Sequence, residues 1–423
     1  MRRGPRSAIL GAALVLTVAA ALAGCAGGDD GVEPVAVNAC GPLVYEGEGE
    51  PDVIVVSNMP LRGRFVPHTT GLVDAMEFVL RKREFRAGEF RVGFQSCDDT
   101  VAGEPDAGQC TRNARAYVAA ESVVGVIGPF LSGCAELQIP IVSRTAAGPL
   151  AMVSPANTSS GLTRGPGALP LYPDGVRGYA RVVTHDEAQG AAAARIARRL
   201  GARRVAVVAQ RGVDDPYVAQ LTPSFRATAR LLGLEERTFD WPVRERYTEL
   251  AASVAAFRPE AVYLVGLPEG NADTLIRDLK AALPDVAIIT PDSFAAEDMT
   301  RELGPVGDGL ITTVPGVPTS ELPPAGQRFL RESGAEIVGT GTGPPEAAQA
   351  TEVLLDAISR SDGTRASVVE EVFATKVENG ILGSFTFDRL GDIDPAPVGV
   401  YRYENGKIVV DGVVRAPLDA EDG

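Results

Sequence analysis

The sequence has 423 residues, of which 45% are hydrophobic, and carries a formal net charge of −15 at pH 7. This acidic balance argues against proteins that bind nucleic acid or anionic lipid, because both kinds of binding need basic patches. The length is enough for two or three domains, and the apolar content is enough to give each of them a core.

Residues 1–24 have the pattern of a secretory signal peptide. Three arginines precede an apolar run over residues 8–23, which is short for a membrane-spanning helix and ends in small residues before Cys25. Cleavage there would leave 423 − 24 = 399 residues with a charge of −15 − 3 = −18. A small, acidic and unpatterned stretch follows, so we predict that residues 25–50 form a linker.

A cysteine directly after Leu-Ala-Gly resembles the bacterial lipoprotein signal. The resemblance implies that the thiol of Cys25 is diacylated and tethers the chain to the membrane. An ordinary cleaved signal and an uncleaved anchor are the alternatives.

Four cysteines remain after Cys25, and an even number in an exported chain indicates two disulfides. Three pairings are possible. We favour Cys97–Cys110, which closes a short acidic loop, and therefore Cys40–Cys134. A zinc site is the alternative, but the sequence has no CxxC pair and neither histidine lies near a cysteine. We therefore predict no metal site.

From residue 52 onward, short apolar runs alternate with amphipathic helical stretches. This alternation is typical of βαβ units that build a parallel sheet. The predicted strands are 53–56, 90–94, 123–127 and 150–153, and the predicted helices are 70–82 and 113–120.

A second series with the same rhythm begins near Arg181. Its predicted helices are 188–200, 222–232, 247–257 and 272–283, and its predicted strands are 205–208, 261–265 and 287–289. The repetition indicates an α/β protein with two doubly wound Rossmann-like lobes rather than one large sheet.

The last part of the chain is shorter and richer in strands. It has a predicted helix at 345–359 and predicted strands at 310–314, 385–387, 399–403 and 407–410. This order fits a chain that returns to the first lobe and finishes in the second. We therefore assign residues 51–180 and 311–381 to lobe 1, and residues 181–310 and 382–415 to lobe 2. Three crossings near 178–184, 311–315 and 381–386 would form the hinge.

Enzyme signatures are absent from the sequence. It contains no G-x-S-x-G, Walker A, H-E-x-x-H or strand-linked G-x-G-x-x-G motif, and it has only two histidines, His68 and His185. The pair Asp98-Asp99 is more typical of a loop with capping acids than of a catalytic dyad. We therefore predict that the protein is not an enzyme and needs no cofactor.

Two loops at predicted strand ends are rich in glycine and hydroxyl residues, namely 128–134 and 154–159. In open α/β sheets, ligands bind at the carboxyl ends of the strands. Hydroxyls and backbone N–H groups beside helix N-termini suit a ligand carboxylate. Capping of the following helices is an equally good explanation of these residues taken alone.

Motifs spread over residues 52–412 occur in an order that resembles a known family. These motifs are Phe94-Gln95-Ser96-Cys97-Asp98-Asp99, Val126-Ile127-Gly128-Pro129 with Ser132, Met152 to Thr158, Asp186-x-x-Gln189-Gly190 and Ile381 to Asp392. They are similar to the branched-chain amino acid (Leu/Ile/Val) solute-binding family of type I periplasmic binding proteins. This resemblance implies a Venus-flytrap fold that closes on a ligand.

The resemblance also implies roles for individual residues. Ser132, the backbone of Ala156, and Thr158 would bind a ligand carboxylate. Asp292 would neutralise a ligand ammonium, and Tyr217 would close over the ligand from the second lobe.

The chain departs from the family pattern in three places. It has Leu267 where the family has a tyrosine, Arg62 and Arg64 in the first loop, and Pro344-Pro345 where an aromatic residue is common. The carboxylate half of the site is therefore better supported than the ammonium half.

Taken together, these features predict a monomeric, extracytoplasmic solute-binding lipoprotein of an ABC importer. Its ligand would be a small amino acid-like or carboxylate compound, and its partners would be an ABC permease and its ATPase. The alternative is a ligand-sensing receptor domain that acts with a separate signalling partner.

Overall fold

The computed structural model describes residues 32–211 and 216–416. The predicted signal peptide and Cys25 lie outside these residues. Within the described part of the chain, no helix is both long and apolar enough to cross a membrane.

The first lobe contains a six-stranded sheet with the strand order β2-β3-β1-β6-β7-β8. Its strands are β1 (Val53–Met59), β2 (Arg86–Ala87), β3 (Phe90–Asp98), β6 (Val123–Ile127), β7 (Ala151–Ser154) and β8 (Tyr179–Arg181). All neighbouring strands are parallel except the short β2, which is antiparallel to β3. A small hairpin of β4 (Thr100–Val101) and β5 (Glu104–Pro105) follows β3.

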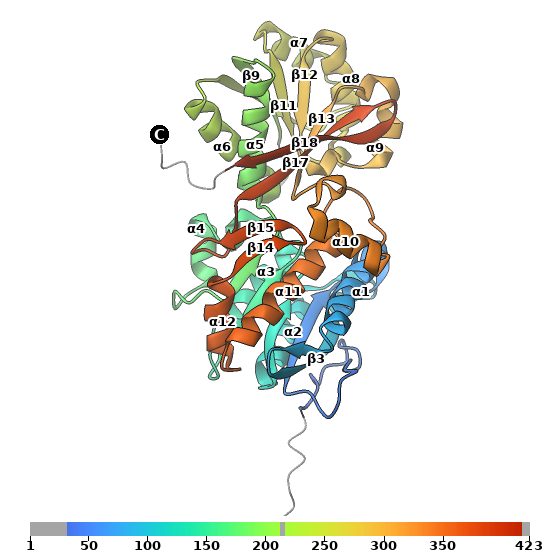
Figure 1. Cartoon of the computed structure of the whole chain (residues 1–423). Coiled ribbons are helices and arrows are strands. Elements are labelled where there is room, and N and C mark those ends of the chain that lie inside the picture. The colour runs from blue at the N-terminus through green and yellow to red at the C-terminus, as the bar shows by residue number, and fades with distance from the viewer. Residues whose placement is uncertain (1–31, 212–215, 417–423) are drawn as a thin grey trace, which may run out of the picture. The chain divides into compact units, whose positions relative to one another are not determined.

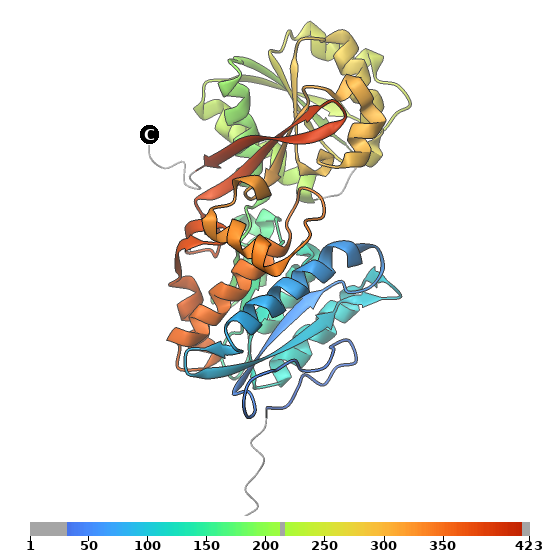
Figure 2. The ribbon, with the colours of Figure 1, turned by 45° about the vertical axis from the view of Figure 1, so that its right-hand side comes forward.

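Helices cover both faces of this sheet because successive strand residues point to opposite sides. Val55 belongs to the core on the side of α1, α11 and α12, whereas its neighbour Val56 belongs to the core on the side of α2 and α3. Figure 2 shows α1 (blue) and α11 (orange) side by side. The helices of this lobe are α1 (Val66–Lys82), α2 (Ala107–Ala119), α3 (Ser132–Val142), α4 (Gly165–Ala168), α10 (Pro324–Ser333), α11 (Pro344–Arg360) and α12 (Arg365–Phe373).

The second lobe contains a seven-stranded sheet with the order β10-β9-β11-β12-β13-β17-β18 (Figure 1). The strands are β9 (Arg204–Gln210), β10 (Glu235–Trp241), β11 (Ala261–Val265), β12 (Ala287–Thr290), β13 (Ile311–Pro315), β17 (Ala396–Glu404) and β18 (Lys407–Ala416). The first five are parallel, and β17 and β18 add an antiparallel hairpin at the edge.

Helices again cover both faces of the second sheet. Two of them pack on one face, and three pack on the other. The first pair is α5 (Asp186–Arg199) and α6 (Pro216–Leu231), and the other three are α7 (Thr248–Ala256), α8 (Ala272–Ala282) and α9 (Glu297–Leu303). The two doubly wound α/β lobes predicted from the sequence are thus confirmed.

The lobe boundaries differ from the predicted ones. Residues 311–315, which we assigned to lobe 1, form β13 and pair with β12 and β17 in the second sheet. Residues 382–394, which we assigned to lobe 2, belong largely to a three-stranded sheet of β14 (Lys376–Gly380), β15 (Gly383–Phe387) and β16 (Ile393–Asp394).

This small sheet packs on the first lobe, because Phe385, Phe387 and Ile393 lie in the core that α1 and α11 also build. The alternating pattern of such strands shows that one of their faces is buried but not which lobe covers it. The third crossing therefore lies between β16 and β17, later than the predicted 381–386.

The three crossings between the lobes meet at Pro397. Its carbonyl accepts a hydrogen bond from the N–H of Gly316 at 2.9 Å and another from the hydroxyl of Thr184. Thr184 lies in the first crossing, between β8 and α5, and Gly316 begins the second crossing, directly after β13. The hinge is therefore a contiguous piece of structure built from three distant parts of the chain.

Both predicted disulfide pairings are wrong. The structure joins Cys40 to Cys97, and Cys110 to Cys134. The segment before residue 45 runs antiparallel beside β3, which places Cys40 opposite Cys97. Cys110 on α2 and Cys134 on α3 face each other because these helices pack together on the same face of the sheet.

Candidate functional site

The loops that follow β6 and β7 lie against each other at the carboxyl edge of the first sheet. The hydroxyl of Ser154 donates to the carbonyl of Pro129 at 3.0 Å, and the Asn157 side chain donates to the carbonyl of Phe130 at 2.9 Å. The N–H of Ser159 donates to the hydroxyl of Ser132 at 3.4 Å. The structure thus brings together the two loops that carry the predicted residues Ser132, Ala156 and Thr158.

Each of these three residues presents a different group at this edge. Ser132 is the first residue of α3, an 11-residue helix, so its hydroxyl lies at the helix N-terminus. The N–H of Ala156 donates to the Ser154 hydroxyl at 3.2 Å. The carbonyl of Thr158 accepts from the N–H of Asp186 at 2.8 Å, which links this loop to the start of the second lobe. All three are partly exposed.

A fully buried arginine holds the second loop in place. One terminal nitrogen of Arg181 donates to the carbonyls of Asn157 at 3.0 Å and Ser159 at 2.8 Å. Its Nε forms an ion pair with Asp392 at 2.7 Å, and Arg164 forms a second ion pair with the same carboxylate at 2.6 Å. Burial alone would raise the pKa of Asp392, but the positive charges around it, Arg181 foremost, hold that pKa well below its ordinary value.

His185 is buried beside this ion pair. Its Nδ1 lies 3.3 Å from the hydroxyl of Ser160, which also accepts from the N–H of Glu187 at 3.0 Å. Burial lowers the pKa of His185 to about 3, so its imidazole is neutral at pH 7. A neutral, buried histidine adds no positive charge to the site.

On the second lobe, Asp292 begins the short helical turn η5 (Asp292–Phe294) after β12. Its Oδ1 accepts a hydrogen bond from the Gln189 side chain at 2.9 Å, and the same amide nitrogen donates to the carbonyl of Thr313 at 2.7 Å. The carboxylate of Asp292, which we predicted to bind a ligand ammonium, is therefore held in place by Gln189 within the second lobe. Tyr217 lies in α6, but its side chain is outside the described residues.

The sequence reasoning missed Gln220, one turn further along α6. Its side-chain oxygen accepts from the N–H of Ser160 at 2.6 Å, and its nitrogen donates to the hydroxyl of Ser159 at 3.2 Å. Gln220 thus connects the second lobe directly to the loop that carries Thr158. The loop before α6 resembles the family poorly, so no sequence signal marked this residue.

The carboxylates of Asp98 and Asp99 accept hydrogen bonds that hold the end of β3 and the loop after it in place. Asp98 accepts from the N–H groups of Leu61 and Thr100, both at 3.0 Å, and Asp99 accepts from Asn58 at 2.9 Å. Burial raises the pKa of Asp99 to about 7, and the neighbouring charge of Asp98 adds to this effect.

Asp99 also lies close to Cys110 and Cys134, with potential ligand atoms within 4.8 Å of one another. The two sulfurs are joined in a disulfide, so they supply no thiolate to a metal ion.

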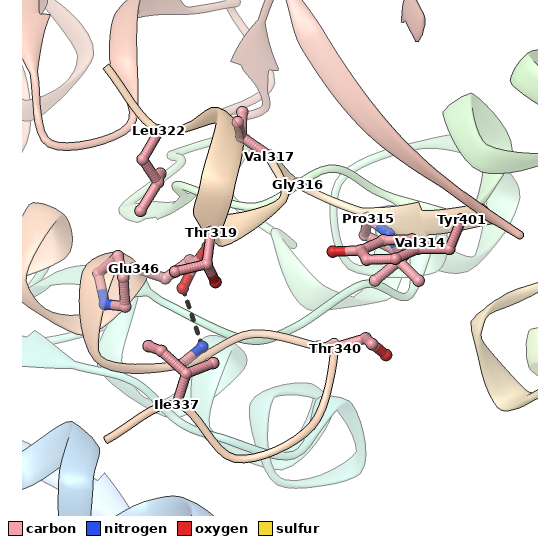
Figure 3. A pocket seen from close by; sticks show the side chains of 13 residues that line it. Val314, Pro315, Gly316, Val317, Thr319, Leu322, Ile337, Thr340, Glu346 and Tyr401 are labelled. Carbon is pink, nitrogen blue, oxygen red and sulfur yellow. Dashed lines mark hydrogen bonds between the residues drawn. The ribbon is translucent and has the colours of Figure 1, made fainter. Parts of the chain in front are cut away.

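A second residue that the sequence reasoning missed is the acidic Glu346, near the start of α11. It lines a pocket at the second crossing together with Gly316, Thr319, Thr340 and Tyr401 (Figure 3). The hydroxyl of Thr340 donates to the carbonyl of Ala295 at 2.9 Å, so one wall of this pocket contacts the second lobe close to Asp292.

Comparisons with known proteins agree with this architecture. A family model described as periplasmic binding protein matches residues 96–405. The Leu/Ile/Val-binding protein BraC3 of Rhizobium johnstonii is 26% identical over 328 residues, which cover 75% of this chain and 82% of that protein.

Two solved structures illustrate the shared fold. The leucine binding protein LivK of Thermotoga maritima matches with a TM-score of 0.65 at 23% identity, over 86% of this chain and 99% of its own. A solute binding protein of R. palustris in complex with benzoate matches with a TM-score of 0.63 at 17% identity, over 87% and 98% of the two chains.

Proposed function

Since the chain belongs to the periplasmic binding protein family of type I, we propose that it is the solute-binding protein of an ABC importer and binds a small carboxylate between its lobes. Its homologues are solute-binding proteins and not enzymes, and the family is extracytoplasmic.

The main support for a carboxylate ligand is that the loops after β6 and β7 lie against each other. Ser132 offers a hydroxyl at the N-terminus of α3, and Thr158, on the loop that lies against it, offers a second hydroxyl. Partial positive charge at a helix N-terminus favours an anion. The relatives support the same chemistry, because Leu, Ile and Val in one name and benzoate in the other all carry a carboxylate.

Closure of the hinge would complete the site from the second lobe. Asp292 and Tyr217 would reach the ligand as the lobes approach each other. The buried pair of Arg181 and Asp392 keeps the first-lobe loop fixed during this motion, because Arg181 binds two carbonyls of that loop. The closed form would then dock on a permease that works with an ATPase, and Cys25 would hold the protein at the membrane as a lipid anchor.

A thermal-unfolding screen tests the ligand class. The panel contains aliphatic and aromatic carboxylates, α-amino acids, and the amide of each compound as a control without a carboxylate. A ligand at about 100 times its Kd should stabilise the protein by about 2.7 kcal/mol. We expect stabilisation by at least one carboxylate and none by its amide. Equal stabilisation by acid and amide would contradict the proposal.

Transport tests the importer role. We expect cells that lack this protein to lose uptake of the compound that stabilises it in the screen. Unchanged uptake together with a lost cellular response to that compound would instead support the ligand-sensing receptor.

A further inference from the structure

The loop over residues 157–160 is fixed to the first lobe. Arg181, at the end of β8, donates to the carbonyls of Asn157 at 3.0 Å and Ser159 at 2.8 Å. The N–H of Ser159 donates to the hydroxyl of Ser132 at 3.4 Å. A bond from the second lobe to this loop is therefore a bond between the lobes.

Two of the bonds from the second lobe lie beside the hinge. The N–H of Asp186 donates to the carbonyl of Thr158 at 2.8 Å, and the N–H of Glu187 donates to the hydroxyl of Ser160 at 3.0 Å. Both donors are backbone groups in the first turn of α5, directly after the first crossing. A rotation displaces groups near its axis least, so these two bonds can persist while the lobes open and close.

Gln220 reaches the same loop from a part of the second lobe that is further along the chain. It lies on α6, which packs so closely on α5 that a Cβ at Gly190 would collide with the hydroxyl of Ser224 and the carbonyl of Leu221. The two helices therefore move together as one rigid piece. A rotation of the second lobe about the crossings carries Gln220 toward the loop or away from it.

Both ends of the Gln220 amide are used in this contact. Its Oε1 accepts from the N–H of Ser160 at 2.6 Å, and its Nε2 donates to the hydroxyl of Ser159 at 3.2 Å. Ser160 is 1% exposed and Ser159 is 8% exposed, so these groups are shielded from water. Without Gln220 the N–H of Ser160 would lose its partner inside the protein, which costs free energy until water reaches it. The contact thus favours the arrangement in which the lobes stay together.

We propose that Gln220 is a latch between the lobes, and that its two hydrogen bonds to Ser159 and Ser160 slow the release of the bound ligand. Gln220 acts as a positioning residue, because it binds the loop that carries Thr158 and not the ligand. The inference rests on the proposed function and deepens it, since it assigns control of release from the same site to one side chain.

The first test needs no ligand. Gln220→Met keeps the length of the side chain but removes the hydrogen-bonding amide. We expect the purified variant without ligand to have a larger radius of gyration than the wild type in small-angle X-ray scattering, because the lobes separate more often. Thermal unfolding of both proteins shows whether the variant is folded.

The second test measures association and dissociation rates by stopped flow. The probes are leucine, valerate and benzoate, which represent an amino acid, an aliphatic carboxylate and an aromatic carboxylate. For each probe that binds, we expect Gln220→Met to raise koff about tenfold or more, as for the loss of two neutral hydrogen bonds, while kon does not fall. A variant that only disordered the loop would also lower kon, because the ligand meets the first lobe before the lobes close.

The matched control is Arg226→Gln on the same helix. Arg226 forms its ion pair with Glu236 of β10 at 2.8 Å, so this bond lies entirely within the second lobe. We expect the control to keep the wild-type radius of gyration and the wild-type rates.

The outcomes separate this inference from the proposed function. If a probe binds but Gln220→Met leaves the radius of gyration or koff unchanged, or lowers kon, the inference is wrong and the proposed function stands. If no probe binds, the carboxylate ligand is in doubt, and the radius of gyration alone decides whether Gln220 holds the lobes together.

Discussion

Arg181 and Asp392 form a fully buried ion pair, 2.7 Å long, between residues that are 211 positions apart in the sequence. Arg181 ends the last strand of the first sheet, and Asp392 immediately precedes the last strand before the third crossing. The same arginine binds the carbonyls of Asn157 and Ser159. The pair therefore couples the hinge to the proposed carboxylate-binding loop.

Removal of the acid from this pair should be costly. Asp392→Asn leaves Arg181 charged and buried with a weaker partner, and loss of one member of a buried pair typically costs about 3–5 kcal/mol. We expect a fall of this order in the free energy of unfolding, measured by urea denaturation, and weaker ligand binding because the loop is less well held. The control is Asp411→Asn, which breaks the half-exposed ion pair with Arg402 and should cost about 1 kcal/mol or less. A loss of under about 1 kcal/mol for Asp392→Asn would contradict the assigned role.

The disulfide pairing can be read directly by peptide mapping under non-reducing conditions. We expect the peptide with Cys40 to be linked to the peptide with Cys97, and Cys110 to be linked to Cys134. Loss of a native disulfide commonly costs about 2–5 kcal/mol, so Cys40→Ser with Cys97→Ser should lower the thermal unfolding temperature. A linked peptide that contains both Cys97 and Cys110 would refute the pairing.

Glu346 should make the stability of the protein depend on pH. Its pKa in the folded protein is about 7 against an ordinary value of 4.5, so the folded state holds a proton that the unfolded state has released between these values. Stability therefore falls as pH rises from about 4.5 to 7, by on the order of 3 kcal/mol for a shift of this size. The variant Glu346→Gln has no carboxyl group at this position, so its stability lacks this part of the pH dependence.

Other groups titrate in the same range, Asp99 among them, so the informative quantity is the difference between wild type and variant. We expect Glu346→Gln to gain stability relative to wild type as pH rises from 5 to 8, measured by chemical denaturation at each pH. A constant difference across this range would show that Glu346 has an ordinary pKa.

The sequence was sufficient to predict the two lobes because their central strands are buried on both faces. Such strands appear as continuous apolar runs, as at Val53–Val56 and Ala261–Val265, and these runs became β1 and β11. The end of the chain was harder to assign to a lobe from its sequence. Phe385 and Phe387 show that one face of β15 is buried, but only the three-dimensional structure shows that the first lobe covers that face.

The candidate site could be predicted only in part. Ser132, Ala156 and Thr158 were predicted because they follow strands and match family motifs. The structure places their loops together, and their binding of a ligand stays a prediction. Gln220 contacts a loop 60 residues away, which no local pattern reveals. Glu346 has the sequence signature of a helix-capping acid, and this local pattern does not reveal that the residue is buried beside the second crossing.

The most direct test of the central claim is the Kd of the best carboxylate from the unfolding screen for Ser132→Ala, measured by isothermal titration. The matched control is Ser143→Ala at the other end of α3, whose hydroxyl donates to the carbonyl of Ile139 within the helix. A hydrogen bond to a charged group contributes about 1.5–3 kcal/mol, so Ser132→Ala should raise the Kd about tenfold to a hundredfold while the control leaves it unchanged. An unchanged Kd in Ser132→Ala would show that the ligand carboxylate does not bind at the loops after β6 and β7.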